Sequence, residues 1–570
     1  MASGLDKIWE ILPPAPEDFK NKFPEIQPVI LQLLYNRGLR TQKQIDEFLL
    51  PDYSQDLHDP FLFRDMKKAV DRIFQAVENK QKVIICGDYD ADGITSTAVL
   101  WIICKKLGLE DATTYIPDRL NGSYGLTGKM IEDFIKREID LIITCDCGIT
   151  SVDEVELAKQ SGIEVIITDH HRSTEKIPKA VAVINPNSRG EKYPFKHLAG
   201  VGVAFKMIQA LLSDSRCRLE NKEAAEKWLL DLVALGTVAD CMPLLGENRT
   251  LVKYGLLVLN KTANFGIRSL VEKSGLELGT LSAEHLAYQL GPRINAASRI
   301  KHADEALKMI LTEDKTEADK LAGVLNSFNS ERQRLVESVF QEIKTEIGEE
   351  PKEKILVVLG NWPKGILGLI ASKLVEQYFR PAVVLTRRDD EVVGSGRSIL
   401  GFDLYRVLDG LSKYFIAFGG HAGALGLTLK EADFPDFKKE VARAGKEAMK
   451  EWDLAPKIKV DALVQMREVN WSLYEELKKF EPFGRSNFLP NFLIKNIRLN
   501  EMSPVGQNGQ HCRLIVGEGK KMIYFSANSK VGGLKPGDKI DVIFQLGVNQ
   551  WNGQQELQMK VVDLKKLQKY

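Results

Sequence analysis

Acidic side chains gather in the run Gly87-Asp88-Tyr89-Asp90-Ala91-Asp92-Gly93, where an apolar stretch at residues 83–86 gives way to a helical pattern. Three carboxylates packed at alternate positions repel one another, and their pKa values rise unless cations neutralise them. Two further β-rich runs, at residues 141–145 and 165–168, end in Asp146 and in Asp169-His170-His171. These residue types and their spacing predict a site for divalent metal ions.

The elements around these residues predict an open parallel sheet. Helical patterns at residues 95–107, 128–138 and 152–161 lie between the apolar runs, which is the alternation expected of βαβ units. The runs are apolar almost throughout, as strands are when helices cover both faces of a sheet. Ligands gather outside the carboxyl ends of such strands. We therefore expect three strands to deliver their acidic and histidine residues to one edge.

The predicted ligand set favours hard or intermediate cations. Carboxylates with one or two imidazoles suit Mn²⁺ or Mg²⁺ better than a zinc site built on thiolates. Cys145 and Cys147 flank Asp146, so thiolate ligation is conceivable, but no second cysteine pair completes a zinc site. Taken alone, each Asp could instead be a helix cap or a turn residue. The oxygen-rich set comprises Asp88, Asp90, Asp92, Asp146 and Asp240. So many carboxylates imply two metals about 3.5 to 4 Å apart, a pair that hydrolyses phosphate esters in line.

The composition limits the possible partners and the compartment. Lysine plus arginine equals aspartate plus glutamate at 78 each, so any nucleic-acid surface must be a local patch. The seven cysteines are odd in number and mostly lie inside apolar runs, which is typical of reduced cytosolic thiols. No apolar run reaches the roughly 20 residues of a membrane span, and no signal peptide is recognisable. We expect a cytoplasmic protein with no membrane contact.

The 570 residues are long enough for three or four domains, at roughly 100 to 200 residues each. A second α/β unit follows a long helical stretch, and short strands with turns follow from about residue 453, a pattern that favours a small OB-like barrel. The predicted boundaries are 1–45 for an N-terminal extension that packs on the main domain, 46–300 for the catalytic domain, 301–350 for a helical connector, 351–452 for the second α/β domain and 453–570 for the OB-like domain.

These motifs resemble those of the DHH phosphoesterase superfamily. The run at 88–93, Asp146, the Asp169-His170-His171 triplet and Asp240 look like its four motifs. The segments 394–398 and 419–423 look like those of its associated DHHA1 domain. Within the superfamily, nearly the whole chain is similar to single-strand-specific 5′→3′ DNA exonucleases. The implied fold is α/β: a parallel-sheet DHH domain joined by a long helix to a second α/β (DHHA1) domain, plus a C-terminal OB-like β-barrel.

The resemblance implies a role for each matching residue. The metal ligands would be Asp88, Asp90, Asp92, Asp146, His170 and Asp240, with Asp88 as a ligand or as support for one. The catalytic residues would be Asp146, His170 and His171, where His171 hydrogen-bonds the scissile phosphate, orients the water or only braces the loop. Arg119, Ser395 and Arg397 would bind a terminal 5′-phosphate. Gly419, Gly420 and His421 would form a wall against the substrate backbone.

The implied activity is a two-metal phosphodiesterase, using Mn²⁺ preferentially or Mg²⁺, that degrades single-stranded DNA from the 5′ end to mononucleotides in DNA repair and recombination. The implied protein is a monomer whose partners include a single-strand-binding protein and a helicase. An alternative is a small-substrate phosphodiesterase of the same superfamily, acting on short oligonucleotides or cyclic dinucleotides. Such enzymes usually lack the terminal β domain. A third reading, a DNA-binding relative with a decayed site, conflicts with the intact carboxylates.

Two features leave questions open. Many relatives carry a histidine after the tryptophan of the second lobe's first loop, whereas this chain has Pro363 followed by Lys364. In the OB-like domain, aromatic and basic residues could bind single strands, although aromatics in a small barrel more often belong to its core. The candidates are Phe483, Arg485, Tyr524, Phe525 and Trp551.

Overall fold

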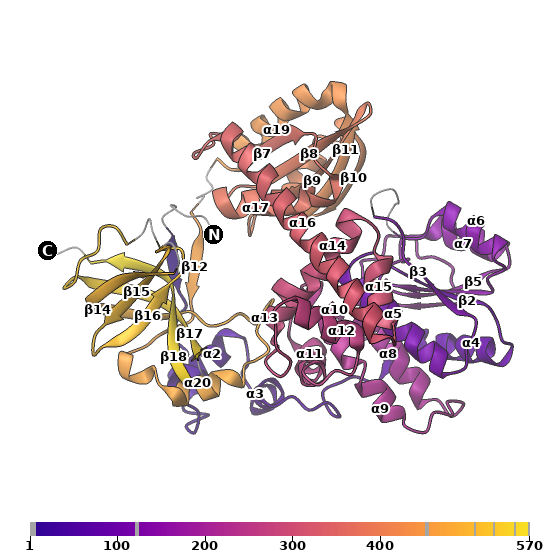
Figure 1. Cartoon of the computed structure of the whole chain (residues 1–570), viewed down its shortest axis with the longest axis horizontal. Coiled ribbons are helices and arrows are strands. Elements are labelled where there is room, and N and C mark those ends of the chain that lie inside the picture. Colours follow the sequence, from indigo (N-terminus) through magenta and orange to yellow (C-terminus); the bar gives the residue numbers. More distant parts are fainter. Residues whose placement is uncertain are drawn as a thin grey trace.

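The computed structural model describes residues 7–119, 125–450, 455–506, 509–527, 531–551 and 554–567. Figure 1 shows three lobes: a large lobe, a second α/β lobe above it, and a barrel lobe formed mainly by the C-terminal strands. A long helix, α16 (Lys315–Ile347), runs from the large lobe into the second lobe. Within the described residues, no helix combines the length and the apolar character needed to cross a membrane.

The large lobe is built on a five-stranded parallel sheet, as the sequence predicts. The strand order is β3-β2-β4-β5-β6, and all four pairings are parallel. The strands are β2 (Val83–Gly87), β3 (Ala112–Tyr115), β4 (Leu141–Cys145), β5 (Glu164–Thr168) and β6 (Ala182–Ile184). Alternate residues point to opposite faces of a strand. Ile85 and Ile143 enter one core and Ile84 and Ile142 another, which explains why the strands are apolar throughout.

Helices cover both faces of this sheet. One face packs against α4 (Met66–Glu78), α5 (Ala91–Lys106) and α8 (Gly200–Ser213), and the other against α6 (Gly128–Lys136) and α7 (Val152–Gln160). Around them lie α9 (Lys222–Lys227), α10 (Leu230–Ala239), α11 (Gly246–Leu259), α12 (Phe265–Lys273), α13 (Ala283–His285), α14 (Gly291–Ile300) and α15 (Asp304–Leu311).

Helix α16 belongs to two cores. Leu325 and Phe328 in its first half are buried with the large lobe, whereas Phe340 and Ile343 in its second half are buried with the second lobe. The second lobe has a mixed sheet in the order β10-β11-β9-β8-β7. Its elements are β7 (Leu356–Gly360), α17 (Leu367–Tyr378), β8 (Ala382–Arg388), β9 (Glu391–Arg397), α18 (Leu404–Asp409), β10 (Phe415–His421), β11 (Ala424–Lys430) and α19 (Phe434–Ala448).

The C-terminal strands form a closed five-stranded barrel with the strand order of an OB fold. The order β14-β15-β16-β18-β17 is closed by the antiparallel pairing of β14 with β17, and β16 pairs with β18 in parallel. Preceding it are β12 (Lys457–Val460), β13 (Ala462–Leu463) and α20 (Trp471–Lys478). The barrel strands are β14 (Phe492–Val505), β15 (His511–Val516), β16 (Lys520–Tyr524), β17 (Lys539–Trp551) and β18 (Gln554–Lys566).

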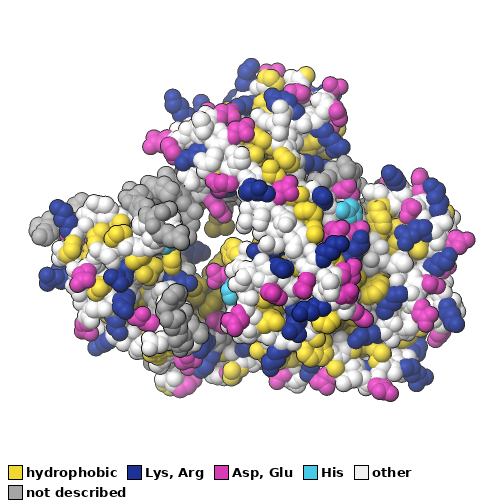
Figure 2. Space-filling view, in the orientation of Figure 1, with side chains coloured by type: hydrophobic (Ala, Val, Ile, Leu, Met, Phe, Trp, Pro, Cys, Tyr) yellow, Lys and Arg dark blue, Asp and Glu magenta, His cyan; other side chains and the backbone are white. Residues whose placement is uncertain are grey.

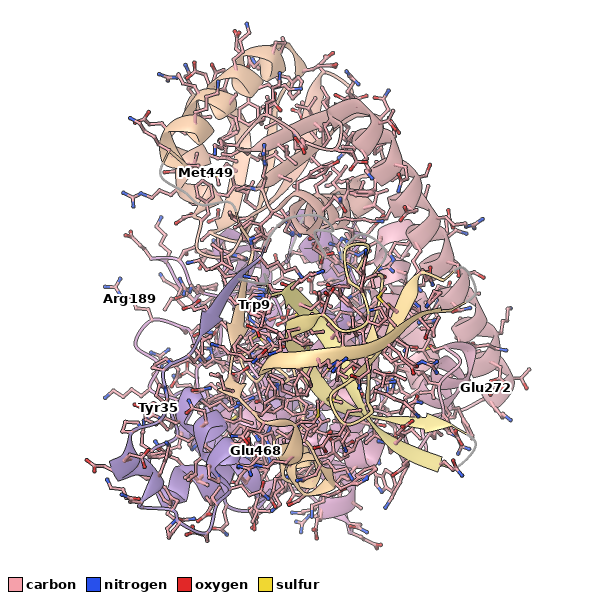
Figure 3. The ribbon with its side chains drawn as sticks, turned by 90° about the vertical axis from the view of Figure 1, so that its left-hand side faces the viewer. Trp9, Tyr35, Arg189, Glu272, Met449 and Glu468 are labelled. Atoms are coloured by element: carbon pink, nitrogen blue, oxygen red, sulfur yellow. The ribbon has the colours of Figure 1, made fainter. Side chains whose placement is uncertain are left out.

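The N-terminal residues differ from the prediction, because most of them pack on the barrel lobe and not on the main domain. The first strand, β1 (Ile8–Ile11), pairs in parallel with β12. Ile30 of α2 (Pro28–Asn36) and Phe48 of α3 (Gln42–Leu49) share a core with the barrel. Figure 3 shows Trp9 beside the barrel strands, where its Nε1–H donates to Asp563 at 2.8 Å. The apolar side of α2 therefore packs on residues that lie about 450 positions later in the chain. Local sequence patterns do not reveal such a long-range contact.

Candidate metal centre and phosphate site

The three predicted acidic motifs follow residues that are paired in one row across the sheet. Gly87 of β2 lies opposite Cys145 of β4, and Cys145 lies opposite Thr168 of β5. Asp88, Asp146 and Asp169 each follow one of these residues. The parallel register therefore brings the motifs to the same edge of the sheet.

Helix termini hold two of the carboxylates. Asp90 is the N-cap of α5, where its Oδ1 accepts the backbone N–H groups of Asp92 and Gly93 at 2.9 and 3.1 Å. Asp92 accepts the N–H groups of Gly200 and Val201 at 2.7 and 2.8 Å. Those two groups open α8, and the N-terminus of a helix attracts negative charge. Helix α8 therefore fixes the Asp92 carboxylate at the edge of the sheet.

Close backbone packing fixes Asp146. Its φ of +60° lies in the left-handed region, which costs energy for a residue other than glycine. Gly200 faces it so closely that a Cβ atom there would lie 2.5 Å from the Asp146 Cβ. The contact leaves no room for any other residue at position 200, so Gly200 is part of the geometry of the site.

Asp169 organises the loop that carries the two histidines. Its carboxylate accepts the backbone N–H groups of Ile149, His170 and His171, and its Oδ1 lies 2.8 Å from the His171 Nδ1. Asn187 completes the support by donating to the carbonyl of His170 at 2.7 Å. Asp169 thus acts as the loop's internal scaffold and turns the histidine rings toward the other motifs.

The His170 ring lies among three carboxylates. Its Nε2 is 3.0 Å from Asp146 Oδ1, 3.7 Å from Asp240 Oδ2 and 3.9 Å from Asp92 Oδ2. Asp240 caps the C-terminal end of α10, so a fourth part of the sequence joins the three motifs. His171 lies at the rim with 44% of its side chain exposed, and its Nδ1 is 3.8 Å from Asp146 Oδ1.

Burial and mutual repulsion raise the pKa values of the carboxyl groups. Burial and then the Asp90 charge raise the pKa of Asp92 to about 7. Burial likewise raises the pKa of Asp88, Asp146 and Asp240 well above the usual range, and neighbouring carboxylates raise it further. His171 and Arg485 act in the opposite direction on Asp240. Four carboxyl groups with raised pKa values form a site that bound cations would stabilise.

The pKa values of the two imidazoles are shifted in opposite directions. Burial, together with the neighbouring His171, lowers the pKa of His170 to about 4, so this ring is neutral at pH 7. A neutral imidazole is the form that binds a metal. Burial alone would lower the pKa of His171, but its hydrogen bond to Asp169 and the nearby carboxylates raise it to about 9. In the metal-free protein His171 is therefore a cation at pH 7, suited to contact an anion.

The donors fit divalent cations. In each of three sets of residues, the possible ligand atoms lie within 4.8 Å of one another. The sets are Asp88, Asp90 and Asp146; Asp92, His170 and Asp240; and Asp146, His170 and His171. Asp88 Oδ1 is buried and has no hydrogen-bond partner among the described residues, an arrangement that a bound cation would satisfy. No such set within the described residues includes a cysteine. Cys147 is buried, with its thiol directed to the carbonyl of Cys86.

Basic residues from both α/β lobes meet near this edge. Arg397 of β9 donates to Ser395 Oγ at 2.9 Å. Burial and the Arg119 charge lower the pKa of Arg397. Burial and then the charges of Arg119, Arg332 and Arg397 lower the pKa of Arg299 to about 9. Cationic groups that depress one another's pKa form a site for an anion. The charges of Arg119 and Arg397 thus lie within reach of each other, with Ser395 bonded to Arg397. Lys364 lies next to Gly365, whose carbonyl accepts from Arg299 at 2.9 Å, and burial, then the charges of Arg388 and Arg119, lower its pKa.

The predicted glycine-rich wall lies on β10, an edge strand of the second lobe. Gly419, Gly420 and His421 are all exposed. Gly420 has a φ of +143° and lies against the carbonyl of Ala424, so its own fold requires glycine. Gly419 has open space where a side chain would be. The structure gives no contact between these residues and the metal centre, so their substrate role stays a prediction.

Comparisons with known proteins match three parts of the chain to family models: the DHH family N-terminal domain at residues 82–237, the DHHA1 domain at 352–447 and the RecJ OB domain at 460–563. The single-stranded-DNA-specific exonuclease RecJ of Bacillus subtilis is 36% identical over 97% of this chain and 70% of its own length. The chain belongs to the RecJ family.

Solved structures of RecJ agree with this assignment. The crystal structure of RecJ from Thermus thermophilus in complex with Mn²⁺ matches with a TM-score of 0.83 and 28% identity, covering 99% of this chain and 80% of that one. The structure of the same protein with Mg²⁺ matches with a TM-score of 0.78, covering 99% of this chain and 79% of that one. The fold expected from the sequence, with its DHH, DHHA1 and OB domains, is confirmed.

Sequence reasoning missed several residues that shape the site of this RecJ-family chain. Asn295 Oδ1 accepts the backbone N–H of Ala91 and so anchors the acidic loop. Ser298 accepts from Arg119 at 3.5 Å. Arg299 was not predicted, although it lies in the same run as Asn295 and Ser298. The available signal was the group of polar residues at 293, 295, 298 and 299 in one short helix, α14.

Some of the residues proposed to bind single strands in the barrel lobe belong to its core, and others are exposed. Tyr524 is buried and belongs to the barrel core, and Phe483 packs partly against that core. Phe525 remains exposed. Arg485 is exposed and donates to the carbonyl of Cys241, next to Asp240. The side chain of Trp551 lies outside the described part of the chain.

Proposed function

We propose that this chain is a single-stranded-DNA-specific exonuclease that removes mononucleotides from the 5′ end. The observation that carries the proposal is the convergence, at one sheet edge, of carboxylates with raised pKa values, a neutral imidazole and a cationic cluster shared by two lobes. The RecJ relatives are named single-stranded-DNA-specific exonucleases, which supports this substrate.

Two divalent cations, Mn²⁺ preferentially or Mg²⁺, are the proposed cofactors. Asp88, Asp90 and Asp146 would hold one cation, and Asp92, His170 and Asp240 the other; the compact grouping of each set supports the division. Asp146 lies close enough to His170 to serve both sets. When bound, such a pair supplies Lewis-acid charge and an activated water for in-line attack at phosphorus.

The remaining residues of the centre bind and orient the substrate in this proposal. The Asp169 carboxylate favours the cationic form of His171, and this form donates a hydrogen bond to the scissile phosphate. Asp169 holds the imidazole ring for that contact by accepting from Nδ1, so Nε2 can face the substrate. The helix α8 keeps Asp92 in place throughout, because both of its carboxylate oxygens accept backbone N–H groups.

The cationic cluster gives the enzyme its end preference. A terminal phosphate is a dianion with three oxygens, whereas an internal phosphodiester carries one charge. Arg119 and Arg397, with Ser395, would bind the terminal 5′-phosphate and so place the first phosphodiester at the metals. Lys364 would add charge where many relatives have a histidine. Gly419, Gly420 and His421 would line the strand on the other side of this pocket.

The biological setting is proposed with the same activity. The chain acts as a monomer in the cytoplasm, in DNA repair and recombination, and works with a single-strand-binding protein and a helicase. All seven cysteines are free thiols, which supports a reducing compartment. The closed barrel supports the preference for long single strands, since OB folds bind such strands.

The test is product analysis over time on single-stranded DNA labelled at either end, with Mn²⁺, Mg²⁺ or EDTA. The proposal predicts metal-dependent release of mononucleotides from the 5′ end, with duplex DNA spared. Activity confined to di- to pentanucleotides would shift the function to a small-substrate phosphodiesterase. Release from the 3′ end would contradict the proposed direction.

A further inference from the structure

A short turn of the barrel lobe reaches the end of helix α10. This docking turn, residues 480–488, leads from α20 into the barrel, and its exposed residues include Arg485 and Phe488. Its partner on the large lobe is the segment just after Asp240, a predicted metal ligand. Figure 1 shows the barrel lobe joined to the large lobe on the side of α11 and α13.

Arg249 anchors the start of the docking turn. This buried residue of α11 donates from Nη1 to the carbonyl of Phe480 and from Nη2 to that of Lys479, both at 2.8 Å. Its Nε donates to the carbonyl of Phe48 at the same distance. One guanidinium therefore ties the large lobe to both chain segments of the barrel lobe, and bonds from a charged donor are the stronger kind.

The turn itself is rigid. Backbone hydrogen bonds join Gly484 and Asn487 in both directions, at 2.9 and 3.1 Å. The buried Asn487 side chain donates to the carbonyls of Phe480 and Pro482 and accepts from Arg37. A Cβ atom at Gly484 would lie 2.6 Å from a Leu244 methyl group. The turn is thus held in one conformation directly against the large lobe.

This rigid turn presents Arg485 to the metal centre. The N–H of Leu244 donates to the Arg485 carbonyl at 2.9 Å, and Arg485 Nη1 donates to the Cys241 carbonyl at 3.1 Å. The guanidinium is close enough that its charge opposes the rise in the pKa of Asp240. The side chain is nevertheless exposed, and Nη1 carries the one side-chain hydrogen bond that the described residues give it. Its remaining N–H donors can bind an anion that lies beside the metal centre.

Phe488 follows on the same turn. Its ring is 70% exposed, yet its carbonyl accepts from Arg37 Nη2 at 2.8 Å, so the backbone beneath the ring is fixed. An exposed aromatic ring on a fixed backbone suits base stacking, because little ordering is needed on binding. Figure 2 shows a hollow in the surface where the three lobes meet.

We infer that the docking turn is a strand-binding element: Arg485 binds a phosphodiester on the 3′ side of the scissile bond, and Phe488 stacks on a base further along. The strand then passes from the metal centre toward the barrel over this turn. The inference rests on the proposed function, since it concerns the path of the same single-stranded substrate. It gives the barrel lobe a direct contact with DNA next to the catalytic residues.

The experiment compares Arg485→Gln and Phe488→Ala with the wild type in the full chain. Lys478→Gln is the control, because it removes one charge from an exposed residue of the same lobe. Hydrolysis is measured on a 5′-phosphorylated thymidine dinucleotide, which has no phosphodiester beyond the scissile one, and on a 20-nucleotide oligothymidine. Binding of the longer strand in EDTA is measured across salt concentrations.

Arg485→Gln should raise KM for the long strand by about five- to tenfold, as expected for one lost charged contact. It should also lower the slope of log K against log salt by about 0.7. Phe488→Ala should raise KM for the long strand by about tenfold with the slope unchanged. Both variants should cleave the dinucleotide within twofold of the wild type, and Lys478→Gln should match it throughout.

The inference is overturned if Arg485→Gln impairs both substrates equally, because the residue would then act through Asp240 and not on the strand. It is also overturned if neither variant alters the long strand. Phe488→Ala removes only an exposed ring and tests the inference even if Arg485→Gln loosens the interface. A wild type without activity on either strand would instead refute the proposed function.

Discussion

The replacement Gly200→Ala tests how Asp146 is positioned. The added Cβ would lie 2.5 Å from the Asp146 Cβ and 2.7 Å from its Cγ and Oδ1. Restoring ordinary contact distances of about 3.5 Å requires the carboxylate to move by roughly 1 Å. Metal ligands keep their distances within about 0.2 Å, and a 1 Å misplacement costs about 100-fold in rate. We therefore expect Gly200→Ala to lose at least about 100-fold in kcat.

Gly202→Ala is the matched control on the same helix. There the new Cβ meets the flexible Leu198 side chain, whose nearest atom is 3.2 Å away. Alanine also favours a helix interior by about 1 kcal/mol over glycine, so this variant should keep its stability and activity within about threefold of the wild type. The assay is the initial rate on 5′-phosphorylated single-stranded DNA, with circular dichroism to show folding. A folded Gly200→Ala variant with near-normal turnover would refute the positioning argument.

Four further predictions concern the same structure. Asp146→Ala should abolish hydrolysis while retaining the fold and single-strand binding, and turnover near the wild-type rate would contradict the site. Arg397→Ala should reduce the preference for a 5′-phosphate over a 5′-hydroxyl by about tenfold or more, since bonds to charged groups contribute about 1.5 to 3 kcal/mol; a wild type without that preference would refute the role. Asp92, with a pKa of about 7, is mostly protonated in the metal-free protein at pH 6, so Mn²⁺ binding should release a proton there. Below pH 7 the apparent affinity should rise by about tenfold or more per pH unit, because Asp88, Asp146 and Asp240 also have raised pKa values. Calorimetry in buffers of different ionisation enthalpy would detect the proton release; an affinity independent of pH would count against metal binding by these carboxylates. Arg249→Met removes the Arg249 bonds to the carbonyls of Phe48 and Lys479 and one of the two donors to the Phe480 carbonyl, so it should lower the free energy of unfolding by about 2 kcal/mol or more, measured by urea denaturation with Lys253→Met as the control; equal stability of the two variants would show that the anchor is unimportant.

Local patterns sufficed to predict that the acidic and histidine residues lie together, and to predict the sheet that carries them. Each acidic motif follows a short apolar strand, and the rule that parallel strands present their carboxyl ends together is enough to predict that Asp88, Asp146 and His170 meet. The register of β2, β4 and β5 agrees with this reasoning. Asp240 ends a helix and follows no strand, so the strand rule does not place it; it was included as a further carboxylate, and the family resemblance then gave it a role.

The long-range contacts were beyond local patterns. The apolar face of α2 predicts that it packs somewhere, but not that its partner is the barrel, hundreds of residues away. Sequence patterns do not predict that Arg249 donates to three backbone carbonyls, because residues of every type carry the same carbonyl group. Arg299 was missed for a related reason: its charge matters only because Arg119 and Arg397 arrive from other segments.

The number and place of the bound cations test the central claim most directly. Crystals of the protein soaked in Mn²⁺ should give an anomalous difference map with two peaks about 3.5 to 4 Å apart. One peak should lie among Asp88, Asp90 and Asp146, and the other among Asp92, His170 and Asp240. A single peak, or peaks away from this edge of the sheet, would contradict a two-metal centre built from these residues.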